Sequence, residues 1–83
     1  MKILYFAWVR EKIGVSSEEI ELPEDIKTID TLLNWMCKKS HIYNEALADK
    51  ELIRFSVNLE FANINHKVKN NDEIAIFPPV TGG

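Results

Sequence analysis

The sequence has 83 residues, of which 46% are hydrophobic and 28% charged, and its formal net charge is −3. A chain of this size forms one compact domain with little room for an internal active-site cleft, since folding buries only about 60% of its unfolded surface. No apolar run approaches the ~18 residues that a membrane span needs, and the apolar opening is too short for a signal peptide. The basic residues are too scattered to neutralise phosphates. We therefore expect a cytoplasmic domain that binds neither nucleic acid nor membrane.

Residues that bind metals or react as nucleophiles are few. Cys37 is the only cysteine, which excludes an internal disulfide. His41 and His66 have no further ligands at the spacing of a zinc site, so such a site would have to be shared between chains. No serine, threonine or cysteine has a predicted histidine neighbour with an orienting acid. We expect no metal, no bound cofactor and no catalysis by the chain on its own.

The N-terminal part predicts a pair of strands. Residues 2–8 are apolar nearly throughout, with aromatic and β-branched members, which is typical of a central strand covered on both faces. Residues 9–13 predict a short helical turn before Gly14. Residues 18–22 alternate in polarity and end at Pro23, which indicates a half-buried strand. We expect the two strands to pair in antiparallel orientation.

A helix is predicted after Thr28, which is a suitable N-cap. Asp30 lies in its first turn, while Lys38 and Lys39 lie in its last, as the helix dipole favours. Apolar residues recur at the spacing that places them on one helical face: Ile29, Leu32, Leu33, Met36 and Cys37. This face is expected to pack on a sheet, with Asn34 and Lys38 outside.

The second half predicts three further strands. One helical turn is expected near 43–47, and strands are expected at 52–59, 61–65 and 73–77. At 70–72, Asn-Asn-Asp predicts a tight turn in which Asn adopts a positive φ. Two strands, a crossing helix and a return into the same sheet define an α+β fold, the β-grasp of ubiquitin-like proteins. We expect a mixed sheet of four to five strands with one main helix on one face, and the first strand beside the last.

The end of the sequence has an unusual composition. The single domain, 1–83, is expected to carry a flexible tail, 78–83, without charge and with little bulk. Its residues are Pro78, Pro79, Val80, Thr81, Gly82 and Gly83. The prolines favour an extended path and the glycines leave the tip without side chains. At ~3.3 to 3.6 Å per residue the tail reaches about 20 Å, enough to enter another protein's buried site. The alternative is that the two glycines are a frayed terminus or a cloning remnant.

Motifs at both ends resemble one protein family. Residues 77–83 read Phe-Pro-Pro-Val-Thr-Gly-Gly, while 4–7 read Leu-Tyr-Phe-Ala and 9–11 read Val-Arg-Glu. The pairs Val-Asn at 57–58 and Asp-Glu at 72–73 fall between them in the matching order. Together these motifs resemble the small subunit of molybdopterin synthase, the MoaD family.

The sequence departs from that family pattern in two respects. Asn71 stands where a glycine is usual in the turn before Asp72, a change that is expected to preserve the backbone conformation. Trp8 and Leu59 stand where more polar residues are expected. These two side chains make the surface more adhesive, which bears on the choice of partner.

The resemblance implies a sulfur carrier. In such a carrier, an ATP-dependent activating enzyme adenylates the carboxylate of Gly83, and a sulfur donor converts it to a thiocarboxylate. The tail, 78–82, then inserts with Gly83 into the large subunit of molybdopterin synthase, which supplies the catalytic groups. There sulfur passes to cyclic pyranopterin monophosphate to build the molybdopterin dithiolene. Phe61 and Phe77 match hydrophobic positions that meet the large subunit, with Phe6 beside them; burial of these rings in the core is the alternative.

Three other functions are compatible with the same residues. A sulfur carrier of the thiazole pathway shares the fold, the activation and the Gly-Gly end, but is usually shorter and lacks the Phe-Pro-Pro approach. A ubiquitin-like modifier would form isopeptide-linked adducts with lysines. A plain β-grasp interaction module would carry an inert tail.

Overall fold

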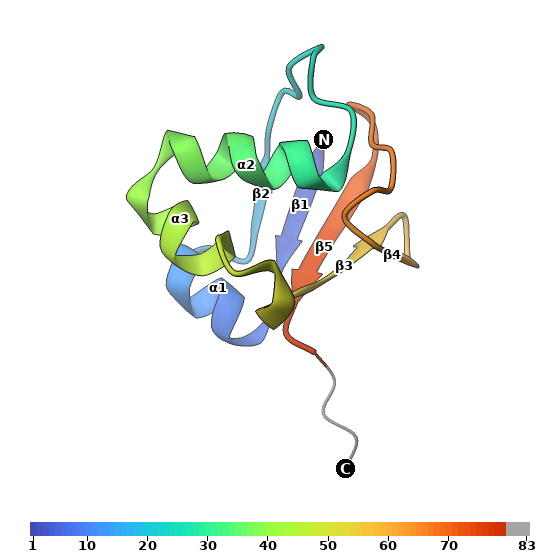
Figure 1. The fold of residues 1–83 in the computed structure, drawn as a ribbon. Helices are drawn as coiled ribbons and strands as arrows, with labels where there is room; N and C mark the ends of the chain where they lie inside the picture. Colours follow the sequence, from blue (N-terminus) through green and yellow to red (C-terminus); the bar gives the residue numbers. More distant parts are fainter. Residues whose placement is uncertain (80–83) are drawn as a thin grey trace.

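The computed structural model describes residues 1–79 of the chain. These residues form a five-stranded sheet in the order β2-β1-β5-β3-β4 (Figure 1). β1 and β5 are parallel, whereas the other neighbouring strands are antiparallel. The elements are β1 (Lys2–Tyr5), α1 (Ala7–Ile13), β2 (Ser17–Glu19), α2 (Ile29–Lys39), α3 (His41–Leu47), the 3-10 helix η1 (Lys50–Leu52), β3 (Arg54–Val57), β4 (Glu60–Ala62) and β5 (Glu73–Phe77). The predicted β-grasp is confirmed, with the first and last strands adjacent.

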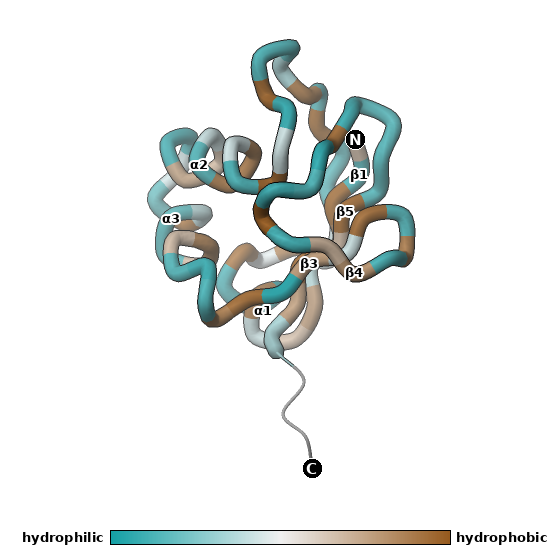
Figure 2. The backbone as a smooth tube through the Cα atoms, turned by 45° about the vertical axis from the view of Figure 1, so that its right-hand side comes forward, coloured by the Kyte–Doolittle hydropathy of each residue, from teal (hydrophilic) through white to brown (hydrophobic). Residues whose placement is uncertain are grey.

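One face of the sheet is packed against the helices, and the other face is not. Side chains alternate along the three central strands, and the members that face the helices are buried: Ile3, Tyr5, Phe55, Val57, Ile74 and Ile76. In Figure 2, which colours the chain by residue hydropathy, β5 consists mainly of hydrophobic residues, while the long loops are mainly hydrophilic. The predicted burial of the first strand on both faces is wrong, because Leu4 points to the uncovered face and is only half-buried.

The prediction for α2 is confirmed in its limits and in its orientation. The Thr28 hydroxyl accepts a hydrogen bond from the Thr31 N–H at 3.2 Å, and the Thr28 N–H donates to the Thr31 hydroxyl at 3.1 Å, a capping box. The predicted apolar stripe faces the core: Ile29, Leu32, Leu33 and Met36 are buried and Cys37 is half-buried. Asn34 and Lys38 are exposed.

The first strand is shorter than predicted. β1 ends at Tyr5, and Trp8 lies in α1, where it packs half-buried against the core. Ala7 has a φ of 52°, a left-handed conformation that turns the chain out of the sheet. Val9 is buried while Arg10 is exposed, so the predicted helical turn is the end of a complete amphipathic helix. A strand followed directly by a short helix thus gives an apolar run that looks, in the sequence, like one longer strand.

The turn at 70–72 forms without the expected positive φ, since neither asparagine has one. Asp72 stabilises this turn instead. Its N–H donates to the Lys69 carbonyl at 3.0 Å, and its Oδ2 accepts from the Lys69 N–H at 2.9 Å. The conformation that a glycine would favour is therefore not required at Asn71. β2, β3 and β4 are also shorter than predicted. For β3, the 3-10 helix η1 includes Leu52, and the two residues after Val57 form a turn.

A polar cluster joins β1, β2 and α3. The Tyr5 hydroxyl donates to Glu18 Oε2 at 2.6 Å, and the Tyr43 hydroxyl lies 2.7 Å from both Glu18 carboxylate oxygens. Burial, followed by the hydrogen bond to Glu18, raises the pKa of Tyr43 to about 12. The same two causes raise the pKa of Tyr5. Glu18 thus tethers the short edge strand to both the sheet and the helical layer.

Candidate functional site

The uncovered face of the sheet carries a row of small and apolar side chains. The strand register places Leu4 opposite Ala75, Ala75 opposite Ser56, and Ser56 opposite Phe61. Directly opposed residues project to the same face of a sheet, so these four side chains cross β1, β5, β3 and β4 in one line. Ala75 and Ser56 are the small members, and they lie in the middle. The surface of the sheet is therefore hollowed at the centre of this row.

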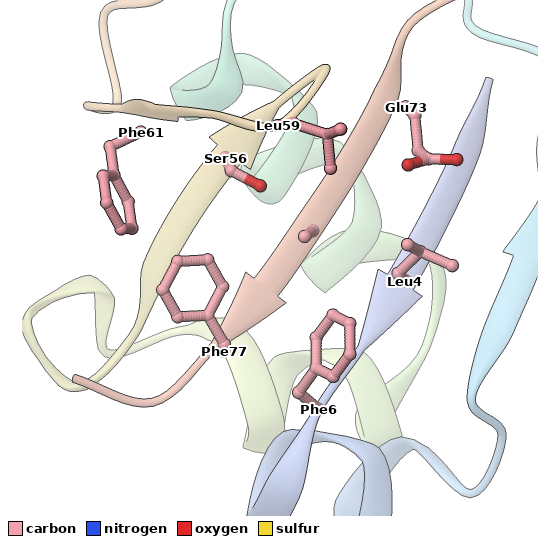
Figure 3. Close-up of a pocket in the computed structure, with 8 residues that line it drawn as sticks. Leu4, Phe6, Ser56, Leu59, Phe61, Glu73 and Phe77 are labelled. Atoms are coloured by element: carbon pink, nitrogen blue, oxygen red, sulfur yellow. The ribbon is translucent and has the colours of Figure 1, made fainter. Parts of the chain in front are cut away.

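Three phenylalanine rings stand around this row (Figure 3). Phe61 is 84% exposed and Phe6 is 45% exposed. The Phe77 ring is half-buried and its centroid lies 6.1 Å from that of Phe61, with the ring planes tilted by 56°. With Leu59 and Glu73 at the rim, the rings enclose a depression of about 320 Å³. The alternative that these rings belong to the core is wrong, and such contiguous exposed apolar groups typically mark an interface.

The chain leaves the sheet at the rim of this depression. β5 ends at Phe77, and the half-buried Pro78 and Pro79 follow. Of the tail predicted from the sequence, these two prolines lie within the described residues. Val80, Thr81, Gly82 and Gly83, the residue predicted to carry sulfur, lie outside them. The segment that leads to the Gly-Gly end thus begins beside the exposed aromatic rings.

The tip of the β3–β4 hairpin also contributes to the rim. Val57 pairs with Glu60, so Asn58 and Leu59 form a two-residue loop. Their φ angles are 51° and 73°, as in the type I′ turn that suits the twist of a hairpin. The Leu59 side chain extends over the sheet towards β5 in Figure 3. The predicted strand 52–59 is wrong at this end, because the apolar Leu59 stands where a hairpin signal would have a glycine.

Asn58 fixes the position of this tip. Its side-chain amide donates to Asp72 Oδ1 at 2.9 Å, and its side-chain carbonyl accepts from the Glu73 N–H at 2.9 Å. Its own N–H donates to the Glu73 carbonyl at 2.8 Å. Asp72 is buried, whereas Asn58 itself is exposed, so the bond between their side chains is partly buried. The two residue pairs that the sequence places in family order, 57–58 and 72–73, therefore meet in space and hold the hairpin against β5.

The described part of the chain offers binding groups rather than reactive ones around this face. Within residues 1–79, no three His, Cys, Asp or Glu side chains are grouped so that they would hold a metal ion. Cys37 is half-buried in α2, with its Sγ 3.9 Å from the Tyr43 carbonyl oxygen. Burial raises the pKa of its thiol, which lowers the thiolate fraction that would react. No helix in this same range is long and apolar enough to cross a membrane.

The fold and the face together define a ubiquitin-like β-grasp protein with an exposed apolar surface beside the exit of its last strand. Residues 3–83 match the ThiS family, and the chain belongs to that family. It is 37% identical to the molybdopterin synthase sulfur carrier subunit of Escherichia coli (strain K12), over 100% of this chain and 99% of that one. The subunit of the same name from Dictyostelium discoideum is 43% identical, over 99% of this chain and 94% of the other.

Solved structures share the fold. SAMP1 from Haloferax volcanii superposes with a TM-score of 0.73 at 25% identity, over 100% of this chain and 98% of the other. A chain of the complex of subunits 1 and 2 of molybdopterin-converting factor from Helicobacter pylori 26695 superposes with a TM-score of 0.61 at 20% identity, over 99% and 96% of the two chains. The second likeness shows the fold alone.

Proposed function

We propose that this chain is the sulfur carrier subunit of molybdopterin synthase and that the carboxylate of Gly83 carries the sulfur. The observation that carries the proposal is the likeness, over the full chain, to relatives that bear this name. The apolar face beside the exit of β5 supports it, because a carrier needs both a surface that docks and a segment that reaches into its partner. The Gly-Gly end suits the second task, since a tip without side chains allows close approach of another protein's backbone.

The chemistry of loading explains why the carrier needs other enzymes. A carboxylate is a poor electrophile, so a Gly83 oxygen first attacks the α-phosphorus of ATP on an activating enzyme, and pyrophosphate leaves. Sulfide released by a sulfur donor then attacks the acyl carbon of this adenylate and displaces AMP, so that a C-terminal thiocarboxylate remains. ATP is consumed by the activating enzyme, and the carrier itself binds no cofactor in this scheme. Because loading requires ATP, we expect the chain to work in the cytoplasm.

Sulfur delivery requires the large subunit of molybdopterin synthase. In our proposal, Phe6, Phe61 and Phe77 dock on that subunit, and the tail from Pro78 to Gly82 inserts so that Gly83 meets cyclic pyranopterin monophosphate. The sulfur atoms of the molybdopterin dithiolene then come from successive thiocarboxylates. The large subunit supplies the catalytic groups, so the carrier is not an enzyme on its own. The H. pylori complex of subunits 1 and 2 is a precedent for a β-grasp subunit in such an assembly.

Intact mass spectrometry of the protein from its host tests the carrier role. We expect a population whose mass corresponds to replacement of one oxygen by sulfur, and tandem fragmentation that assigns the replacement to Gly83. An isopeptide-linked adduct with a lysine of another protein would instead identify a modifier. A chain without either species, also after incubation with the activating enzyme, ATP and a sulfur donor, would contradict the proposal.

Two length variants test the role of the terminal carbonyl. Adding one residue after Gly83, or deleting Gly83, moves the reacting carbon by ~3.5 Å, whereas reaction needs approach within about 3 to 3.5 Å. Both variants are expected to fold and to dock, because they leave unchanged every residue of the described core, which runs from Met1 to Ile76. Neither should be adenylated efficiently or support molybdopterin formation in a reconstituted assay. Normal adenylation and product formation by the deletion variant would refute the thiocarboxylate at Gly83.

A further inference from the structure

Leu59 has a backbone conformation that its own side chain disfavours. It is the second residue of the type I′ turn and has a φ of 73°. In this left-handed region the Cβ atom lies too close to the following carbonyl oxygen, so glycine is strongly preferred at this place in a hairpin. A glycine or asparagine would form the same turn with less strain. The hairpin alone therefore does not explain a leucine here.

The side chain of Leu59 also has no role in the core. It is 88% exposed, more than the other large hydrophobic side chains that stand in solvent. The turn is nevertheless held in place, because Asn58 bonds to Asp72 and to both backbone polar groups of Glu73. A strained, water-exposed leucine at a rigidly anchored tip lowers the stability of the isolated chain. Such strain is typical of positions that act in binding.

The position of the side chain indicates what it binds. Leu59 extends the apolar face at the end opposite to Phe6, and it lines the same depression as Phe61 and Phe77 (Figure 3). The surface is continuous from the exit of β5 to the hairpin tip. Because the backbone of the turn is already held in place, binding does not have to order it, which favours affinity. A partner that covers the phenylalanine rings and the depression between them also covers this leucine.

We infer that Leu59 is a further anchor of the docking face, and that it selects a large subunit with an apolar contact opposite the hairpin tip. The inference rests on the proposed function, since the occupant is the large subunit of molybdopterin synthase. Leu59 acts by desolvation, so a large subunit with a polar group at this contact binds less tightly. The leucine thereby determines which large subunit this carrier prefers.

Two turn-compatible variants, Leu59→Gly and Leu59→Asn, test this anchor in the full chain. We expect each to be at least as stable to thermal unfolding as the wild type, because the left-handed strain is relieved. Each should bind the large subunit encoded in the same genome about tenfold or more weakly by titration calorimetry, as loss of an interface anchor does. Leu59→Met, which keeps an apolar side chain of similar size, should stay within about threefold of the wild type.

Ile42→Asn is the matched control, because Ile42 is 51% exposed but lies on α3, in the helical layer. This variant should bind as the wild type does. If Leu59→Gly binds with wild-type affinity while Phe61→Glu does not bind, the inference is overturned and the proposed docking face stands. If the leucine variants lose stability along with affinity, Leu59 has a structural role and the inference is again overturned. If the wild type itself does not bind the large subunit, both proposals fail.

Discussion

Phe61 and Phe77 lie on β4 and β5, which are separated in the sheet by β3, yet their ring centroids are only 6.1 Å apart. On β3, Phe61 is opposite the small Ser56 while Phe77 is opposite Arg54, so the two rings meet on a diagonal across this strand. An aromatic side chain buries about 150–250 Å² when it is fully covered, and Phe61 is 84% exposed. Covering most of this ring at about 25 cal/mol per Å² contributes on the order of 3 kcal/mol before the costs of association.

Phe61→Glu should therefore weaken binding to the large subunit by ~2 kcal/mol or more, because it places an unpaired charge in a desolvated contact. The variant should fold, since the wild-type side chain is exposed. Titration calorimetry gives the affinity, and circular dichroism confirms the fold. Phe61→Leu, which preserves an apolar contact, serves as the control and should bind more tightly than the glutamate variant. Unchanged affinity in folded Phe61→Glu would remove Phe61 from the interface.

Cys37→Ala should leave sulfur transfer intact, because Cys37 lies in the helical layer and burial raises the pKa of its thiol. We expect a stability loss of about 1 kcal/mol, since the residue is half-buried and the truncation is small. Chemical denaturation measures the loss, and a reconstituted molybdopterin assay measures the transfer. A folded Cys37→Ala protein that no longer delivers sulfur would show that Gly83 is not the sole carrier of sulfur.

Among the helices and strands, the sequence predicted those boundaries that are set by neighbouring residues. Thr28 predicted the start of α2 because capping involves only the next few residues. The end of β1 was not predictable in this way, since Tyr5 and Trp8 are both apolar and only the left-handed Ala7 separates strand from helix. The exposed apolar face shows the same limit. The family resemblance predicted Phe61 and Phe77, and the strand pattern predicted Phe6 beside them, but their meeting with Leu59 depends on strand register, which is a tertiary property.

The tyrosine cluster predicts the behaviour of the sheet edge at high pH. Tyr5 and Tyr43 are the two tyrosines of the chain, and both have a raised pKa. The folded state therefore holds more phenolic protons than the unfolded state above about pH 10, so stability falls as the pH rises from there. One pH unit above that value, the tyrosinate absorbance of the folded protein should stay small, while the urea-unfolded chain ionises normally. A folded protein that ionises at the ordinary tyrosine pKa would contradict the cluster.

In the whole molecule, the hydrophobic core, the exposed apolar face and the exit of the C-terminal segment occupy different places. The helical layer covers the core, the other face of the sheet carries the exposed apolar residues that we propose for docking, and the last strand ends beside that face. Figure 1 shows the helices on one side of the sheet and the C-terminal end of β5 at its lower edge. Because β5 lies at the centre of the sheet between β1 and β3, the exit point is held by strands on both sides. In the proposed function, docking and delivery are therefore coupled, since a partner that binds the face also fixes the point from which the tail starts.

This separation predicts that a shortened chain ending at Pro79 is a competitive inhibitor. It keeps every described element and the whole docking face, so it should fold and bind the large subunit within about tenfold of the full chain, as exposed termini tolerate truncation. It lacks Gly83, so it delivers no sulfur. In an assay with thiocarboxylated full-length chain, it should slow molybdopterin formation, and more full-length chain should restore the rate. The shortened chain with Phe61→Glu should not inhibit, because its docking face is disrupted. If the folded shortened chain leaves the rate of molybdopterin formation unchanged, residues 80–83, and not the sheet face, account for binding to the large subunit.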